Sequence, residues 1–274
     1  MTVPAPARGP RRGCNPDVWR NVRIAILLLI LAVAAWSTLY DRLSTTDWDE
    51  TLTIGIFPID ESGNAVARDY IARLSEDRIA DVEEFLNQEA HEYGIGIARP
   101  VRVELYPPVV ERPPERAADS NVFQNMWWSL KLRMYARRAS RASGKPPPQI
   151  RIFVIYHDPN FTKSVPHSVG VQKGLVGVVH AFADAAMTRG NSVVIAHEIL
   201  HTVGATDKYD PATLAPLYPT GYAEPDKKPL LPQPFAEIMA GRRAVDDNNF
   251  EMPESLDRVV VGEATAREIR WIRQ

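Results

Sequence analysis

The residues best suited to chemistry lie together in the segment IAHEILHTVGATD, residues 195–207. His197 and His201 are four residues apart, so on a helix their imidazoles would lie on one side and could bind a single metal ion. Glu198 follows the first histidine, where its carboxylate would reach a metal-bound water without ligating the metal. This HExxH spacing predicts a metal site in which Glu198 is the catalytic general base.

The residues after the second histidine predict the third ligand. Gly204 stands three residues past His201, where a left-handed glycine can end a helix and reverse the chain. Asp207, three residues later, would then return to the metal. A rival interpretation makes Asp207 a turn residue, and in that case Glu224 or Glu237 would complete a His-His-Glu site.

The extended motif resembles that of the metzincin metallopeptidases, in the Asp-ending version of snapalysin-like members. The matching residues are His197, Glu198, His201, Gly204 and Asp207. The resemblance implies Zn²⁺ as cofactor and a Met-turn, a tight turn with a methionine beneath the metal, for which Met239 stands at the expected place. It also implies an α+β, metzincin-like zincin catalytic domain: a twisted mixed sheet with long helices, the active-site helix and a small irregular C-terminal subdomain.

Two positions depart from the family pattern. Asp207 is a harder, anionic donor than a third imidazole, so the site would be less exclusive for zinc. Astacin-like and serralysin-like relatives carry a tyrosine two residues after the Met-turn methionine, where this chain has Gly241. The transition-state role of that tyrosine is either absent here or falls to Tyr209, Tyr218 or Tyr222.

The elements expected around the motif are mostly strands. Apolar patterns predict strands over residues 51–59, 101–106 and 149–156, and one or two more within 174–183. A helical period runs over residues 68–93, and a strand, a helix and a strand in that order predict a parallel βαβ unit. Asn191 or Ser192 is expected to cap the active-site helix.

A helical insertion is expected over residues 121–145. Its apolar stripe, Phe123, Trp127, Leu130 and Met134, predicts that the first half packs on the core and that the second half leaves it. The insertion is also basic, through Lys131, Arg133, Arg137, Arg138, Arg141 and Lys145. A solvated face explains these charges, and a patch for an anionic ligand is the alternative.

The N-terminus predicts membrane anchoring. Residues 1–21 read as a disordered cytoplasmic tail, and residues 22–40 as a transmembrane helix, a signal anchor. Arginines precede this segment and acidic residues follow it, so residues 41–274 are expected outside the cytoplasm, in the periplasm or extracellular space of a bacterium. A cleaved signal peptide is the alternative.

Composition restricts the partners. The chain has 274 residues, a net charge of −2 and one cysteine, Cys14. Residues 41–274 keep 27 basic and 33 acidic residues, a net charge of −6, so no nucleic-acid partner is expected. Those residues also lack cysteine, which excludes a cysteine-switch mechanism of latency.

These inferences combine into one functional hypothesis. The chain is expected to be a membrane-tethered zinc endopeptidase, with an upper subdomain over about 51–207 and a lower one over about 208–274 that holds the Met-turn. His197, His201 and Asp207 would bind Zn²⁺, and Glu198 would activate water to hydrolyse a protein or peptide substrate. That substrate would lie along an edge strand, either His167–Gln172 or Leu175–Val179. The alternatives are a membrane-anchored binding module with a structural metal, and a zinc hydrolase of a non-peptide amide.

Overall fold

The computed structural model describes residues 19–29, 32, 46–60, 65–117, 120–161, 168–171 and 175–272. The chain divides into two compact units, Met1–Asp41 and Arg42–Gln274. The second unit holds the sheet, the HExxH motif and every strand described below.

The first unit is helical over residues 19–29. Across the described ranges, no helix has the length and apolar character needed to span a membrane. This finding contradicts the predicted transmembrane helix and the single-pass topology built on it. Residues 1–18, 30, 31 and 33–45 lie outside the described residues.

The second unit is built on a five-stranded sheet with the strand order β2-β1-β3-β5-β4. Its strands are β1 (Leu52–Asp60), β2 (Val101–Leu105), β3 (Ile150–His157), β4 (Val169–Val171) and β5 (Val176–Phe182). β1, β2, β3 and β5 are parallel, and only β4 is antiparallel to its neighbour. The predicted α+β class is therefore wrong: the fold is α/β with a mostly parallel sheet, because helical crossovers connect β1 to β2 and β2 to β3.

The described edge strand on the β5 side of the sheet is β4. It overlaps the predicted edge segment 167–172, whereas β5 lies between β3 and β4. The expectation that residues 175–179 form an edge is wrong, because both sides of β5 are already hydrogen-bonded.

The helix predicted over residues 68–93 is divided into three parts. They are α2 (Ala65–Ala72), the 3₁₀ turn η1 (Glu76–Arg78) and α3 (Ala80–Glu92). Hydrogen bonds from Arg73 N to Tyr70 O and from Leu74 N to Ile71 O tighten the end of α2. Ser75 is then extended, with φ −131° and ψ 166°, so the helix cannot continue through it.

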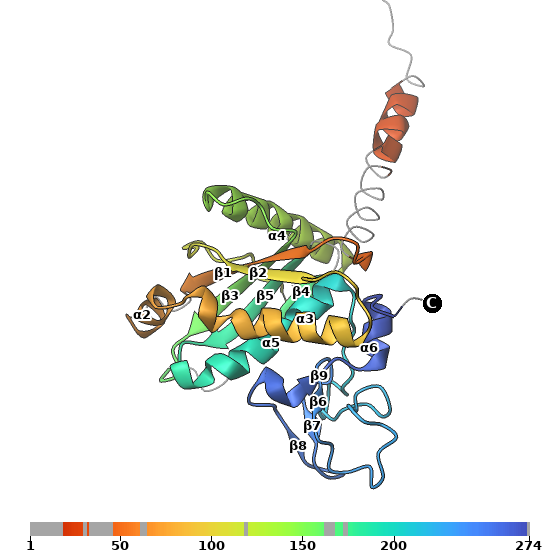
Figure 1. Cartoon of the computed structure of the whole chain (residues 1–274). Coiled ribbons are helices and arrows are strands. Elements are labelled where there is room, and N and C mark those ends of the chain that lie inside the picture. The colour runs from red at the N-terminus through yellow and green to blue at the C-terminus, as the bar shows by residue number, and fades with distance from the viewer. Residues whose placement is uncertain are drawn as a thin grey trace, which may run out of the picture. The chain divides into compact units, whose positions relative to one another are not determined.

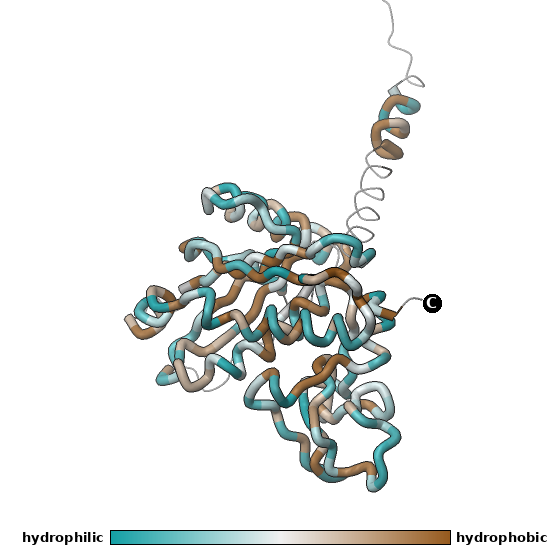
Figure 2. Tube along the Cα trace, in the orientation of Figure 1, coloured by the Kyte–Doolittle hydropathy of each residue, from teal (hydrophilic) through white to brown (hydrophobic). Residues whose placement is uncertain are grey.

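Helices cover both faces of the sheet (Figure 1). α3 and α5 (Thr188–Val203) pack on one face, and α4 (Val122–Ala142) packs on the other. Successive strand residues alternate between the two cores: Ile152 and Val154 belong to the first, Phe153 and Ile155 to the second. Figure 2 shows the apolar residues concentrated along these central strands. Burial on both faces explains their continuous apolar sequence.

α4 packs opposite to the prediction. Its second half is buried against the sheet through Leu132, Tyr135, Ala136 and Ala139, and Tyr135 contacts Phe153 with ring centroids 4.9 Å apart. The predicted core stripe at Phe123, Trp127, Leu130 and Met134 is exposed instead. The buried residues share a different side of the helix, so the more apolar side faces solvent.

The C-terminal segment contains short elements: β6 (Ala236–Glu237), β7 (Arg243–Ala244), β8 (Phe250–Glu251), η4 (Leu256–Arg258), β9 (Val259–Val260) and α6 (Glu263–Glu268). Of these, η4, β9 and α6 contribute residues to the core of α3 and α5. Trp48, just before β1, donates its indole N–H to Ile269 O at 2.7 Å and meets Trp271 edge-on. The beginning and the end of this unit are thus held in one core.

Candidate metal centre

The helix that carries the HExxH motif, α5, begins earlier than predicted. It starts at Thr188, directly after the 3₁₀ turn η3 (Ala185–Met187), so neither Asn191 nor Ser192 is its N-cap. Both residues hold the helix in place instead. The Asn191 side chain exchanges two hydrogen bonds with the backbone of Phe182 at the end of β5, and the Ser192 hydroxyl donates to Asp81 on α3.

α5 brings the two histidines and the glutamate of the motif together. Ligand atoms of His197, Glu198 and His201 all lie within 4.8 Å of one another, close enough to hold a metal ion. The imidazole rings are 4.6 Å apart and nearly perpendicular. Glu198 is buried beside Gly177 of β5, and a Cβ at Gly177 would come within 2.7 Å of Ile152 Cδ1 but would only touch Glu198 Cβ, at 4.0 Å.

The chain reversal after α5 brings Asp207 to the same place. Gly204 has φ 117°, a left-handed conformation, and the backbone amides of Gly204 and Ala205 both donate to Leu200 O. Asp207 Oδ1 then lies 3.3 Å from His197 Nε2 and 3.1 Å from His201 Nε2.

Backbone carbonyls determine which nitrogen each imidazole presents. His197 Nδ1 is 2.8 Å from Ile238 O, and His201 Nδ1 is 2.8 Å from Ala205 O. A carbonyl oxygen can only accept, so both Nδ1 atoms carry hydrogen and donate. In the neutral ring Nε2 is then the lone-pair nitrogen, and both Nε2 atoms face Asp207.

This arrangement fits a metal ion. While both imidazoles are neutral, two Nε2 lone pairs and a carboxylate oxygen face one another, and either a proton on Nε2 or a metal ion can bridge them. Ligands about 2.0–2.1 Å from a tetrahedral metal are separated by about 3.3 Å, close to the two N–O distances found here. Two imidazoles and a carboxylate are a ligand set that zinc accepts.

The charges at the site favour a cation. Burial raises the pKa of Asp207, but hydrogen bonds with His197 and His201 outweigh it and hold the pKa well below its usual range. Burial lowers the pKa of His201, but the hydrogen bond to Asp207 and the nearby charge of Glu198 bring it above its ordinary value. The two shifts are reciprocal: the imidazoles favour the ionised form of Asp207, and the carboxylates of Asp207 and Glu198 favour the protonated form of His201.

Met239 lies in a tight turn that contacts the site through its backbone. Ala240 N donates to Glu237 O, and Gly241, with φ 67°, donates to the same oxygen. Met239 itself is fully buried, and its carbonyl accepts from Lys208 N at 2.9 Å. Since the preceding carbonyl, Ile238 O, accepts from His197, this turn supports both the first histidine and the loop that carries Asp207.

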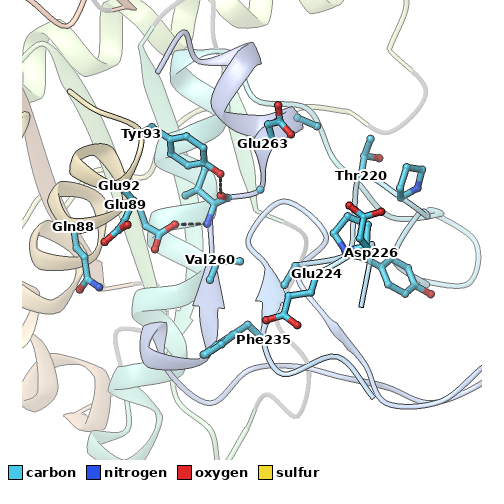
Figure 3. A pocket seen from close by; sticks show the side chains of 17 residues that line it. Gln88, Glu89, Glu92, Tyr93, Thr220, Glu224, Asp226, Phe235, Val260 and Glu263 are labelled. Atoms are coloured by element: carbon cyan, nitrogen blue, oxygen red, sulfur yellow. Dashed lines mark hydrogen bonds between the residues drawn. The ribbon is translucent and has the colours of Figure 1, made fainter. Parts of the chain in front are cut away.

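The two alternative third ligands lie elsewhere. Glu237 is fully buried, and its carboxylate accepts from Thr265 Oγ1 at 2.6 Å and from the amides of Gly262 and Ala240. Glu224 lines an acidic cavity of about 670 Å³ between α3 and the C-terminal segment (Figure 3). The described walls of that cavity include neither His197 nor His201.

The three candidate tyrosines differ in their surroundings. Burial raises the pKa of Tyr209, and the charges of Asp207 and Glu198 raise it further, which places its phenol within their electrostatic reach. Tyr218 and Tyr222 instead pack edge-on against each other, 5.4 Å apart, and Tyr218 is largely exposed.

A clamp on the Asp207 loop was not predicted from the sequence. Glu268 on α6 accepts from Thr206 N, Thr206 Oγ1 and Lys208 Nζ at 2.7–2.8 Å, so both neighbours of Asp207 are held. The Lys208 side chain is buried. In the sequence, only the position of Lys208 next to the predicted ligand Asp207 pointed to this contact. Its partner Glu268 lies 60 residues away and could not be identified from the sequence.

Comparison with known proteins adds no family assignment: no protein-family model matches the chain, and no curated protein matches it.

Proposed function

We propose that this chain is a zinc-dependent hydrolase of peptide bonds, with His197, His201 and Asp207 as ligands and Glu198 as the general base. The observation that carries the proposal is that Asp207 Oδ1 lies within 3.3 Å of both His197 Nε2 and His201 Nε2, with the buried Glu198 carboxylate in the same cluster. Burying two imidazoles and a carboxylate on one helix costs free energy unless a cation neutralises their charge.

The proposal assigns different roles to the two carboxylates. Asp207 Oδ1 lies at ligand-to-ligand distance from both Nε2 atoms and is therefore the third ligand. Glu198 belongs to the same cluster, and the proposal assigns its buried carboxylate to proton transfer because it follows the first histidine in the HExxH spacing.

The chemistry follows from these roles. Bound Zn²⁺ would supply the Lewis acid that polarises the scissile carbonyl and activates water. Glu198 would accept the proton of the attacking water and deliver it to the leaving amine. Tyr209 would donate a hydrogen bond to the developing oxyanion, since it is the candidate tyrosine whose pKa is raised by the charges of both Asp207 and Glu198.

A protein or peptide substrate is supported by the sheet edge. β4 has β5 on one side, so the other side of this short strand can pair with an extended peptide. The metzincin-like spacing and the turn at Met239, whose neighbour Ile238 contacts His197, point to the same class of enzyme.

The test is cleavage of a peptide library by the zinc-loaded chain and by its Glu198→Gln variant. Glutamine keeps the shape but cannot take the proton, so we expect turnover to fall by about 10²–10⁴-fold while zinc content is unchanged. Equal cleavage by both proteins would contradict the role of Glu198. If neither protein cleaves peptides, the same pair assayed on non-peptide amides distinguishes a different amide hydrolase from a binding module with a structural metal.

A further inference from the structure

The first half of α4 presents an unusually apolar surface. Phe123, Met126, Trp127, Leu130 and Met134 are each 46–77% exposed. Their spacing of three and four residues places all five on one side of the helix, in a ridge about 16 Å long. Exposed apolar patches of this kind mark interaction sites on soluble domains.

This ridge is rigid without a partner. Asn121 and Gln124 form a reciprocal capping box, so the first turn of α4 is already ordered. Trp128 donates to Pro114 O at 2.7 Å and Tyr135 donates to Glu111 O, both from the opposite side of the helix. The ridge residues are therefore presented to solvent by a helix that is held from behind.

The charge of α4 is of one sign. The helix contains five basic residues and no acidic one. Arg137 and Arg141 are exposed and continue the line of the ridge by one and two further turns. Lys131 lies at its flank, 5.7 Å from the centre of the Trp127 ring. The surface is thus apolar over three turns and cationic over the next two.

We propose that this ridge is the docking site for an acidic amphipathic helix of a partner protein. The partner would pack apolar side chains against Phe123, Trp127 and Leu130 and place carboxylates opposite Arg137 and Arg141, since guanidinium groups pair with carboxylates in bidentate geometry. α4 covers the sheet face opposite to α5, so this surface is independent of the metal centre and of the function proposed for it.

Two other occupants fit the charges less well. A helix lying flat in a bilayer interface keeps its basic residues beside or opposite its apolar side, whereas Arg137 and Arg141 stand in line with the apolar ridge and would be pressed to the same depth. A second copy of the chain would bring a net charge of +5 on one α4 against the same charge on the other.

The experiment uses the full chain and two synthetic helical peptides of about 18 residues. Each has leucine on one side over its central three turns. One carries glutamate at both ends, so that either orientation serves, and the other carries lysine there. Binding is followed by fluorescence anisotropy of a labelled peptide. The variants are Trp127→Ala and the charge reversal Arg137→Glu/Arg141→Glu, and the matched control is Phe161→Ala, which truncates an exposed aromatic outside α4.

We expect the glutamate peptide to bind the wild-type chain and the Phe161→Ala control equally. Trp127→Ala should weaken binding at least about tenfold. The charge reversal should weaken binding of the glutamate peptide by a similar factor and should create binding of the lysine peptide, while the circular dichroism spectrum stays unchanged. The proposal is overturned if the glutamate peptide binds with a dissociation constant above about 1 mM, or if it binds both variants as tightly as the wild-type chain. It is also overturned if the ridge instead binds phosphatidylglycerol vesicles, or if Trp127→Ala abolishes self-association of the chain in sedimentation.

Discussion

Two carbonyl oxygens decide which nitrogen each imidazole offers to a cation. Ala205 O is local to His201, but Ile238 O lies 41 residues beyond His197 and comes from the turn at Met239. The first histidine is therefore oriented by a distant segment, in the way that metal-binding histidines commonly use a carbonyl partner. Side-chain substitutions cannot remove these carbonyls, but changes in the turn can displace them.

A substitution at Tyr209 tests its proposed hydrogen bond to the oxyanion. Tyr209→Phe keeps the ring and removes the hydroxyl, so we predict that kcat falls by roughly 10–100-fold while zinc affinity and thermal stability stay unchanged. Tyr218→Phe, in the exposed ring pair, is the matched control and should behave as wild type. Steady-state kinetics on a cleaved peptide measure both, and equal kcat for all three proteins would remove Tyr209 from the mechanism.

At the scale of the elements, hydrogen bonds from α6 and from the turn at Met239 hold the segment around Asp207. Glu268 fixes Thr206 and Lys208, while Met239 O fixes the Lys208 amide. We predict that Glu268→Gln, which weakens the charge-assisted bond to buried Lys208, lowers zinc affinity by about tenfold. Competition with a chromophoric chelator measures this. Glu263→Gln, on the exposed side of α6, should leave the affinity unchanged, and loss of affinity in both variants would show a general effect of α6 instead.

Buried His157 on β3 and half-buried His180 on β5 form a pair that should make the stability depend on pH. His157 Nε2 and His180 Nδ1 are 2.8 Å apart, and burial lowers both pKa values, that of His180 to about 4. The unfolded chain therefore binds protons below pH 6.5 that the folded pair does not bind. Stability is complete above pH 6.5 and decreases as the pH falls toward 4.

The corresponding measurement compares urea unfolding at pH 7 and pH 5. Between pH 7 and pH 5 the free energy of unfolding of the wild-type chain should decrease by on the order of 1 kcal/mol more than that of His180→Gln, after allowance for solvent screening. His91→Gln, at an exposed position, is the control and should follow the wild type. An equal loss in wild type and His180→Gln would show that the pair does not govern the acid response.

The elements also show what the sequence could predict. The i, i+4 histidines and the left-handed Gly204 are local features, so the spacing of the motif was sufficient for them. The apolar stripe from Phe123 to Met134 did not predict which side of α4 is buried. Leu132 and Ala139 are buried because they pack in one core with Phe153 and Val178 of the sheet, a tertiary contact that the helix sequence does not contain. The start of α5 was missed since Asn191 bonds to β5, a tertiary contact, instead of capping its own helix.

At the scale of the whole molecule, the candidate metal centre is built from distant parts of the second unit. α5, the Asp207 loop, the turn at Met239 and α6 all support it, and the same core includes Trp48 and Trp271 from the two ends of this unit. The α/β class follows from the crossovers, which the predicted βαβ unit already contained, although the resemblance suggested α+β. A bound metal should therefore stabilise the entire unit.

The most direct test of the metal centre is the metal content of the purified full chain, beside Asp207→Ala and the control Asp210→Ala. Asp210 is half-buried, and its carboxylate accepts hydrogen bonds within its own turn, from the amides of Ala212 and Thr213 and from the Thr213 side chain. Elemental mass spectrometry after zinc reconstitution should find about one zinc per chain in the wild type and in Asp210→Ala, and clearly less in Asp207→Ala after dialysis. Zinc retained in full by Asp207→Ala, or no zinc in any of the three proteins, would contradict the proposed site.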